Sequence, residues 1–334
     1  MFNYLEPPNA YYEFERIYTA EQWAKKQRWI IDYLTEHQPD VIGFQEVFSI
    51  ESLKELVKEQ GYAYFAVVDE PQVIDDFIYK RPVVAIAAKY PIVEVATVEH
   101  DHELAKSLGL TDDFTFSRKV LRATITLPHI GNTDCYVVHF KSKRSMIELD
   151  EQNKDLTPEK NIIELLKADI AGTWGSTIQR GSEATLLMMD IIARRESTQN
   201  PMVLMGDFNN DLADGVLSHL LTNTLRFAPA FDSNTYLAKY CLNDAWQLFA
   251  KSQLNLANQN TVDLKRKPTH YFGASSSVLD YILLSCEFDS SYDDSFFEVS
   301  QYHTYDRHLI NPEFERDDLS TDHGVVLISL ALRS

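Results

Sequence analysis

The chain contains few cysteines and no long apolar run. Its 334 residues include only Cys135, Cys241 and Cys286, which are widely spaced. This pattern gives neither a zinc site nor a disulfide framework, and it suits a reducing compartment. No apolar run approaches the length that spans a bilayer, so we expect no membrane span. The opening residues "MFNYLEPPNA" lack the basic start and apolar stretch of a signal peptide. The cytoplasm is therefore slightly favoured, with secretion as the alternative if an N-terminal segment was removed.

Positive charge is also scarce. The chain has 31 Lys and Arg against 50 Asp and Glu, which gives a formal net charge of −19. Such a surface repels polyanions unless the charge is uneven, so it argues against a tight nonspecific grip on nucleic acid. A divalent cation at a site would still recruit a phosphate locally.

No repeat, low-complexity segment or Gly/Ser-rich linker divides the chain, so we expect one domain over residues 1–334. Helices are predicted over Thr19–His37, which opens with a Thr19–Gln22 capping box, over Ser52–Gln60, and over "SEATLLMMDIIARR", where Met188 and Met189 are expected in the core. Strands are predicted over Val41–Phe44, Val83–Ala88, Val120–Leu127, Cys135–Phe140, Met202–Met205, Leu279–Leu284 and Val325–Leu330. Several adjacent strands are joined by turns too short for parallel crossovers. The pattern predicts an α/β fold in which two mainly antiparallel sheets pack face to face with helices outside.

The predicted strands repeatedly end in polar side chains. Residues of this kind are Glu46, His139, Asp207, Asn209, Asp280, Asp322 and His323. Burial of a lone carboxylate is costly without a partner or a metal. The repeated occurrence of polar residues at the ends of buried strands is therefore hard to explain as a set of independent structural coincidences. Each also has a structural explanation when taken alone.

These structural explanations differ from residue to residue. Glu46 could cap the following segment, His139 could be a satisfied core histidine, and Asp280 could be a core acid bonded to backbone or an arginine. Asp207 and Asn209 could form an Asx-turn. An EF-hand calcium loop from Asp207 is excluded, because Leu212 and Ser218 stand where glycine and glutamate are required.

Taken together, the residues describe a site for a hard cation. Carboxylate and amide oxygens suit Mg²⁺ or Mn²⁺, which also accept phosphate oxygens as ligands. Two histidines add proton transfer, and Asp280 could orient His323 and stabilise its protonated form. The set favours metal-assisted hydrolysis of a phosphate ester.

Five blocks carry a family resemblance. "GFQEV", "VVHFKSK", "GDFNND", "LDYILLS" and "STDHGVV" resemble, in order, the signature blocks of the endonuclease/exonuclease/phosphatase superfamily. They span most of the chain. The resemblance implies a four-layered α/β sandwich and a group of enzymes that includes nucleases, deadenylases, neutral sphingomyelinases and inositol polyphosphate phosphatases.

The resemblance also implies roles for individual residues. Glu46 would be the principal Mg²⁺ ligand, with Asp322 assisting at the metal. Asp207 and Asn209 would position the attacking water and the phosphate, with Asp207 a candidate general base. His323, paired with Asp280, would contact the phosphate, and His139 would hydrogen-bond a phosphate oxygen in the transition state.

The N-terminal block departs from the family. Members usually open with a full apolar strand that ends in an asparagine near the metal, whereas only Met1 and Phe2 precede Asn3 here. Asn3 is the candidate for that metal-site asparagine. Alternatively it is the second asparagine of an N-x-x-N pattern whose first half is missing.

Candidate substrate-binding residues are Lys141, Arg180 and His270. Lys141 lies in the "HFKSK" block, Arg180 precedes the "SEATLL" helix, and His270 follows the basic stretch "LKRKP". A solvated basic turn and a surface position at a helix start are the alternatives for Lys141 and Arg180. Either Arg118 or Arg122, which flank a predicted strand, could face the cleft.

These observations favour a Mg²⁺- or Mn²⁺-dependent enzyme that hydrolyses phosphodiesters by in-line attack of water. A nuclease is the first choice because of "HFKSK", so the expected partner is a phosphate-ester substrate such as nucleic acid. A phosphomonoesterase, or an esterase of the sphingomyelinase or inositol-phosphatase kind, is the alternative. Outside enzymes, an inactive binding module or a calcium-stabilised structural domain remains. We expect a monomer without a protein partner.

Overall fold

The computed structural model describes residues 3–147, 157–223, 225, 233–256 and 264–333. Its larger sheet has six strands in the order β11-β14-β10-β9-β8-β7. Neighbouring strands are antiparallel except for β9 and β10, which are parallel. A parallel pair needs a long crossover, and the helix α4 (Pro158–Thr198) supplies it. The strands are β7 (Ile92–Thr97), β8 (Leu121–Leu127), β9 (Gly131–His139), β10 (Met202–Asp207), β11 (Asn243–Asp244) and β14 (Asp280–Leu284).

A second layer of strands faces this sheet. It contains β2 (Val41–Val47), β3 (Tyr64–Ala66) and β6 (Val83–Ala88) in the order β2-β6-β3, beside the antiparallel pair β15 (Phe297–Tyr305) and β16 (Val325–Leu332). Smaller sheets flank these layers: β1 (Ala10–Tyr11), β5 (Ile78–Lys80) and β4 (Gln72–Ile74) form one, and β12 (His270–Phe272) pairs with β13 (Ser275–Ser277).

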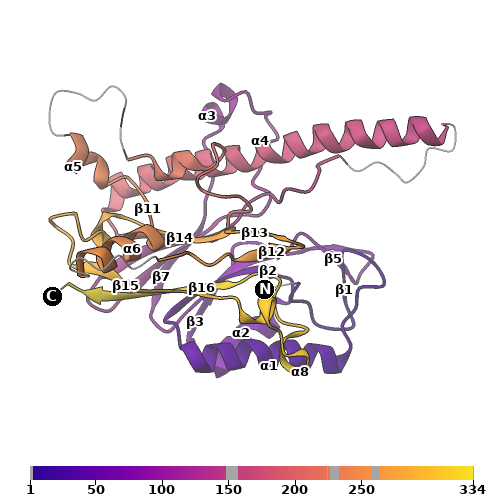
Figure 1. Ribbon diagram of the computed structural model, residues 1–334, viewed down its shortest axis with the longest axis horizontal. Helices are drawn as coiled ribbons and strands as arrows, with labels where there is room; N and C mark the ends of the chain where they lie inside the picture. Colours follow the sequence, from indigo (N-terminus) through magenta and orange to yellow (C-terminus); the bar gives the residue numbers. More distant parts are fainter. Residues whose placement is uncertain (1–2, 148–156, 224, 226–232, 257–263, 334) are drawn as a thin grey trace.

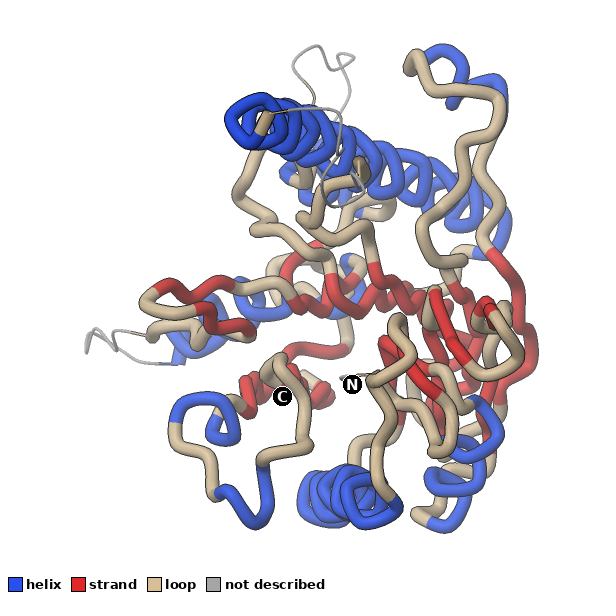
Figure 2. The backbone as a smooth tube through the Cα atoms, turned by 90° about the vertical axis from the view of Figure 1, so that its right-hand side faces the viewer, coloured by secondary structure: helices blue, strands red, loops and turns tan. Residues whose placement is uncertain are grey.

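Helices cover the outer faces of both layers (Figures 1 and 2). On one side are α1 (Ala20–His37) and α2 (Ile50–Glu59), and on the other is α4. The core between the layers joins Ile86 of the smaller sheet to Leu121 and Leu284 of the larger one. The two-sheet sandwich with helices outside is therefore confirmed. The remaining helices are α3 (His102–Ser107), α5 (Ser233–Ala238), α6 (Ala245–Leu256), α7 (Arg307–Ile310) and α8 (Phe314–Asp317), with 3₁₀ turns at Ser218–Leu221 and Cys286–Phe288.

The helix α4 is far longer than the sequence pattern predicts. It begins after an N-cap at Thr157, whose side chain accepts the Lys160 amide, and it has proline at its first helical position. The predicted segment Ser182–Arg195 is only its C-terminal half. Met188 is buried there, but Met189 is 43% exposed, so the prediction of a core position for Met189 is wrong.

Other boundaries differ less. The capping box at Thr19 is confirmed, with Gln22 and Thr19 each accepting the other's backbone amide. β2 continues past its predicted end at Phe44 to Val47, because the strand absorbs Gln45 and Glu46 in an irregularity of its pairing with β6. The strands β7 and β15 were not predicted, since several of their apolar side chains face solvent or a partly exposed surface and blur the pattern.

A cavity of about 660 Å³ lies between α1, β2 and β16. Its walls are mostly apolar and include Ile42, Met205, Ile282 and Ile328. Among the described residues, β16 pairs only with β15, and β2 pairs with β6 and with a single bridge at Tyr4. Asp280 and His323 are among the residues that line this cavity, so it adjoins the site described next.

Candidate active site

Three predicted site residues stand side by side at the ends of neighbouring strands. Asp207, the last residue of β10, is paired in register with His139 of β9 on one side and Asp280 of β14 on the other. The Nε2 atom of His139 lies 3.5 Å from Oδ2 of Asp207. Two hydrogen-bonded strand ladders therefore bring together residues that are up to 141 positions apart in the sequence.

The turn after β10 holds the Asp207 carboxylate in place. Gly206 has a φ of +143°, and a β-carbon there would collide with the carbonyl oxygen of Val138. Asn209 has a φ of 53°, and its amide donates to Oδ1 of Asp207 at 2.7 Å. The Asn209 side chain donates to the Phe140 carbonyl at 2.9 Å and to Oδ2 of Asp207 at 3.2 Å. Asn209 thus fixes Asp207 from the side of the turn.

His323 completes this group from the far end of the chain. Its Nδ1 lies 2.8 Å from Oδ2 of Asp280, so Nδ1 carries the proton and Nε2 is left for another partner. Ligand atoms of Asp207, Asp280 and His323 all lie within 4.8 Å of one another. His270 forms a backbone bridge with His323, and their ring centroids are 5.0 Å apart. The structure therefore places the predicted pocket residue His270 beside His323.

Asn3 and Glu46 form a second group of oxygen atoms. The Asn3 amide donates to Oε2 of Glu46 at 2.9 Å, and the Tyr4 amide donates to the Glu46 carbonyl at 3.0 Å. Glu46 has a φ of 59° and Asn3 a φ of 43°, both in the left-handed region that non-glycine residues seldom adopt. Oδ1 of Asn3 is buried without a hydrogen-bond partner. An orphaned amide oxygen beside a carboxylate is a fitting donor pair for a hard cation.

Burial and neighbouring charge set the protonation states. Burial, followed by the charge of Asp280, raises the pKa of Asp207 to about 7. Burial and then the charge of Arg118 hold the pKa of His139 well below its usual value, so this imidazole is neutral. Burial alone would lower the pKa of His323, but the charge and hydrogen bond of Asp280 raise it to about 10. The site therefore combines a titratable carboxyl, a neutral imidazole and an imidazolium at neutral pH.

A buried lysine beneath the site was not predicted. Lys26 of α1 is 2% exposed, and its Nζ donates to the carbonyls of Leu319 at 3.3 Å and Ser320 at 3.1 Å. Burial lowers its pKa to about 8, against the opposing charges of Glu46 and Asp322. Its position on the apolar face of α1, between Trp23 and Ile30, is a signal that the sequence does contain.

A comparison with protein-family models identifies the family of the chain. The model described as "Endonuclease/Exonuclease/phosphatase family" matches residues 14–291, which include five of the seven polar strand-end residues, all except Asp322 and His323. The chain belongs to the endonuclease/exonuclease/phosphatase family. No curated protein sequence matched the chain closely.

Solved structures of the family share the fold at low sequence identity. The catalytic domain of human Nocturnin with bound sulfate superposes with a TM-score of 0.55 at 15% identity, over 93% of this chain and 87% of that one. An endonuclease/exonuclease/phosphatase from Bacteroides vulgatus gives 0.52 at 15% identity, over 93% and 92%. A D. rerio TDP2 humanized by 14 mutations gives 0.51 at 13% identity, over 93% of both chains. At these identities the likeness concerns the fold.

Two of the predicted substrate-binding residues, Arg180 and Lys141, donate hydrogen bonds to backbone carbonyls and so have a structural role. Arg180 lies inside α4 and is 3% exposed, so the prediction of a position before the helix is wrong. Its Nη1 donates to the Lys141 carbonyl at 2.9 Å, while Nζ of Lys141 donates to the Arg144 carbonyl at 3.0 Å. Arg180 therefore supports the loop that follows His139.

Of the two arginines considered for the cleft, Arg118 is the one near the site. Its Nη1 lies 3.5 Å from the Phe140 carbonyl, and its charge acts on His139. Arg122 instead binds Glu94 at 2.8 Å on the larger sheet. Asp322 is exposed and lies outside the cluster of Asp207, Asp280 and His323, although its charge acts on His323. Among the described residues, no helix is long and apolar enough to cross a membrane.

Proposed function

We propose that this protein hydrolyses phosphodiesters with the help of a divalent cation, Mg²⁺ or Mn²⁺, through in-line attack of water, as a nuclease does. The observation that carries the proposal is the in-register row His139–Asp207–Asp280, closed by the 2.8 Å pair of Asp280 and His323. The row together with His323 supplies a proton acceptor, a hydrogen-bond donor and a positively charged imidazolium around one phosphate.

The cation fits the oxygen atoms of Asn3 and Glu46 better than the Asp207–Asp280–His323 group. Although the latter three gather within 4.8 Å, His323 is protonated at neutral pH and Asp280 already accepts a hydrogen bond from its Nδ1–H. An imidazolium has no lone pair for a metal. We therefore assign the cation to Glu46 and Oδ1 of Asn3, with Asp322 assisting; when bound, it would neutralise charge on the phosphate oxygens.

The chain's own residues would then divide the remaining work. Asp207 has a pKa of about 7, so it accepts a proton from the attacking water at physiological pH, and Asn209 holds its carboxylate in orientation. His323 has Nε2 directed away from Asp280 and donates to a phosphate oxygen or the leaving group. His139, neutral and adjacent to Asp207, donates a hydrogen bond to another phosphate oxygen. Lys141 and His270 stand at the rim of this phosphate position as substrate contacts.

Hydrolysis of a small or lipid-linked phosphate ester is the second candidate. The net charge of −19 disfavours long polyanions, and Lys141 and Arg180 are partly occupied with backbone carbonyls. A sphingomyelinase- or inositol-phosphatase-like substrate would need fewer cations. If the protein were not an enzyme but an inactive binding module on the same fold, Asp207 would not need to titrate near neutral pH.

The test is a substrate panel with matched variants. Purified protein is assayed on DNA, RNA, sphingomyelin, inositol phosphates and nucleotides with Mg²⁺, with Mn²⁺ and with EDTA. We expect metal-dependent turnover of a phosphodiester. Asp207→Asn and His323→Asn should each lower kcat at least about 100-fold, because each removes a proton-transfer group. Asp211→Asn is the control, since Asp211 caps the same turn through the Ala213 amide but is exposed.

The outcomes separate the candidates. Turnover of monoesters or lipid substrates alone would replace the nuclease by the second candidate. The proposal of an enzyme active at this site would be refuted if no metal-dependent turnover were found, or if both site variants kept full activity. Calorimetric titration with Mn²⁺ tests the cation assignment independently: Glu46→Gln should weaken binding at least about tenfold, whereas Asp280→Asn should not.

A further inference from the structure

The long helix α4 has two halves with opposite environments. In its C-terminal half, Ala184, Leu187 and Ile191 are buried against the larger sheet. Its N-terminal half projects past the end of the sheets (Figure 1) and carries large apolar side chains in the open. An apolar helix face that no other element covers indicates a surface that binds a partner.

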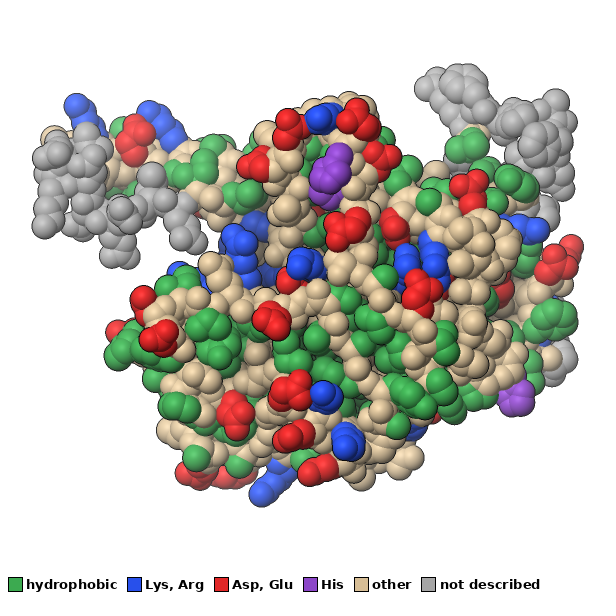
Figure 3. All heavy atoms as spheres, turned by 180° about the vertical axis from the view of Figure 1, so that it is seen from behind, with side chains coloured by type: hydrophobic (Ala, Val, Ile, Leu, Met, Phe, Trp, Pro, Cys, Tyr) green, Lys and Arg blue, Asp and Glu red, His purple; other side chains and the backbone are tan. Residues whose placement is uncertain are grey.

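The exposed apolar side chains form a regular row. Five of them follow one another at intervals of four residues, with exposed fractions of 44% to 66%; they are Ile162, Leu166, Ile170, Trp174 and Ile178. Ile163 lies on the same face as Leu166 and Ile170 and widens the row, at 50% exposure. Side chains four apart form a continuous ridge on a helix, so this row is a packing ridge. Green side chains follow the projecting helix in Figure 3.

The opposite side of the same half is occupied. The Met146 amide donates to the Gly172 carbonyl at 3.1 Å, and Ser176 donates to the carbonyl of Arg144. Both contacts belong to the loop that follows Lys141. The ridge therefore faces away from the body of the molecule, and no described element covers it.

We propose that this ridge pairs with the same ridge of a second copy of the chain, antiparallel about Ile170. The row is symmetric about that residue: Leu166 and Trp174 lie four positions to either side, and Ile162 and Ile178 lie eight positions to either side. The row turns by about 40° at each step, so an antiparallel pairing sets Ile170 against Ile170 and Leu166 against the partner's Trp174, while Ile162 and Ile178 flank this contact. Such self-complementarity is what a twofold interface requires.

Local charge permits the pairing despite the acidity of the whole chain. The projecting half carries Glu159, Glu164 and Asp169 against Lys160 and Lys167, a local balance of −1 from three acids and two lysines, compared with −19 overall. Reflection about Ile170 brings Lys167 level with Thr173 and Glu164 level with Ser176, so like charges do not meet there. A membrane surface fits less well, because Asp169 and Thr173 interrupt the apolar face and the molecule is strongly anionic.

The available area suits a weak, concentration-dependent dimer. A large apolar side chain that becomes fully buried removes on the order of 100 Å² from water. Six side chains about half exposed therefore supply roughly 300 Å² per copy and roughly 600 Å² per pair. If about 60% of the interface is apolar, the total is roughly 1,000 Å², a size typical of weak or transient interfaces. This proposal replaces the expectation of a monomer.

The first test measures mass against concentration by sedimentation. The chain should move from 38.4 kDa toward twice that mass as its concentration rises from about 1 μM to about 100 μM. Ile170→Lys should abolish the shift, because it places two like charges at the symmetry axis while lowering the net negative charge. Phe296→Lys is the matched control, since Phe296 is 73% exposed and lies outside α4.

The second test reports the symmetry of the contact. Ile170→Cys should form a symmetric disulfide under mild oxidation, because the two residues meet at the axis and the native cysteines are buried. Glu164→Cys should not, since twelve residues separate it from its counterpart's level, about 18 Å along the helix.

Three results would overturn the proposal: a monomer at all concentrations, a dimer that persists in the Ile170→Lys variant, or a monomer that binds phosphatidylcholine vesicles through this ridge. None of these measurements depends on enzyme activity.

Discussion

At the scale of single residues, the site depends on groups held against their intrinsic preferences. Asn3, Glu46 and Asn209 adopt left-handed backbone conformations, and Lys26 is a buried cation beneath the acids. Each such feature costs free energy that the surrounding contacts must offset. Their concentration around one set of oxygen atoms supports the placement of the site there.

Lys26 gives a prediction at this scale. Lys26→Met should lower kcat at least about tenfold, because the loop that leads to Asp322 and His323 loses two hydrogen bonds from Nζ. Thermal stability should change little or rise, since a buried charge is replaced by an apolar side chain of similar shape. Turnover and unfolding temperature are measured on the same preparation. A large loss of stability in parallel with activity would show that Lys26 serves the fold alone.

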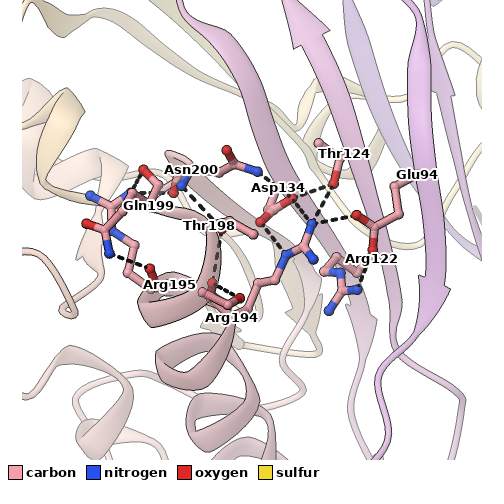
Figure 4. Close-up of polar contacts among 10 residues, drawn as sticks. Glu94, Arg122, Thr124, Asp134, Arg194, Arg195, Thr198, Gln199 and Asn200 are labelled. Carbon is pink, nitrogen blue, oxygen red and sulfur yellow. Dashed lines mark hydrogen bonds and ion pairs between the residues drawn. The ribbon is translucent and has the colours of Figure 1, made fainter.

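At the scale of elements, the strand ends and the α4–sheet contact hold the site in register. Gly206 lets β10 turn sharply against β9, and Arg194 of α4 ties the helix to the sheet (Figure 4). Nε of Arg194 lies 2.9 Å from Oδ2 of Asp134, and Nη2 lies 2.7 Å from Oε2 of Glu94. The Asp134 carboxylate also accepts a hydrogen bond from the Thr124 hydroxyl at 2.5 Å. The network lies at the opposite end of β9 from His139, so it fixes the strand that carries that histidine.

Gly206→Ala should be among the most damaging small changes. The added methyl group meets the Val138 carbonyl, and the backbone conformation is unfavourable for any side chain. We expect a loss of at least ~2 kcal/mol in unfolding free energy, together with a fall in activity as Asp207 shifts. Gly109→Ala is the control, since Gly109 also has positive φ but open space around it; there we expect a loss of about 1 kcal/mol. Equal losses at both positions would contradict the steric argument.

Arg194→Met should change the pH dependence of stability. Burial alone would raise the pKa of Asp134, but hydrogen bonds from Arg194 and Thr124 keep it below its ordinary value of 3.8. Asp134 therefore stabilises the native state above that value, and this stability is lost as pH falls through the lower folded pKa. Without Arg194, burial should raise the pKa, so the variant's deficit should grow from pH 4 to pH 7, reaching about 3 kcal/mol.

Urea unfolding of both proteins at several pH values provides the measurement. Lys167→Met, which breaks the exposed pair of Lys167 with Glu164 at 2.8 Å, is the control and should cost less than ~0.5 kcal/mol. A deficit independent of pH in Arg194→Met would mean that the network acts through packing rather than charge.

At the scale of the whole molecule, the net charge of −19 limits how substrates arrive. For the phosphoesterase proposed above, a site in a negative field would gain little from long-range attraction, so recognition would rest on the cation and the few groups next to the phosphate. The projecting half of α4 adds a second whole-molecule feature, since it extends the surface beyond the sheets that carry the candidate site.

The response to salt tests this account. If the substrate is a nucleic acid, kcat/KM should change less than about threefold between 50 and 200 mM salt, whereas proteins with six to ten phosphate contacts lose about 10³- to 10⁵-fold in affinity. Steady-state rates on a dinucleotide and on a long polymer provide the comparison. A steep decline with the polymer alone would reveal an extended basic track on the surface.

The sequence by itself determined the class of the fold and predicted which polar residues would gather at the candidate site. Polar residues at the ends of apolar runs indicated His139, Asp207, Asp280 and His323, because burial of such groups demands partners wherever the strands lie. The spacing of apolar residues predicted α1 and five of the strands to within two residues, namely β6, β8, β10, β14 and β16, since local periodicity reflects which face is buried.

Only the tertiary structure decided what depends on non-local contact. The register of β9, β10 and β14 fixes which carboxyls are neighbours, and no local pattern contains that register. The burial of Arg180 and Lys26, and the exposure of Met189, follow from the path of helices over the sheets. Only the part of α4 that packs on the larger sheet was predicted, although its first half carries apolar side chains at the four-residue spacing of a helix.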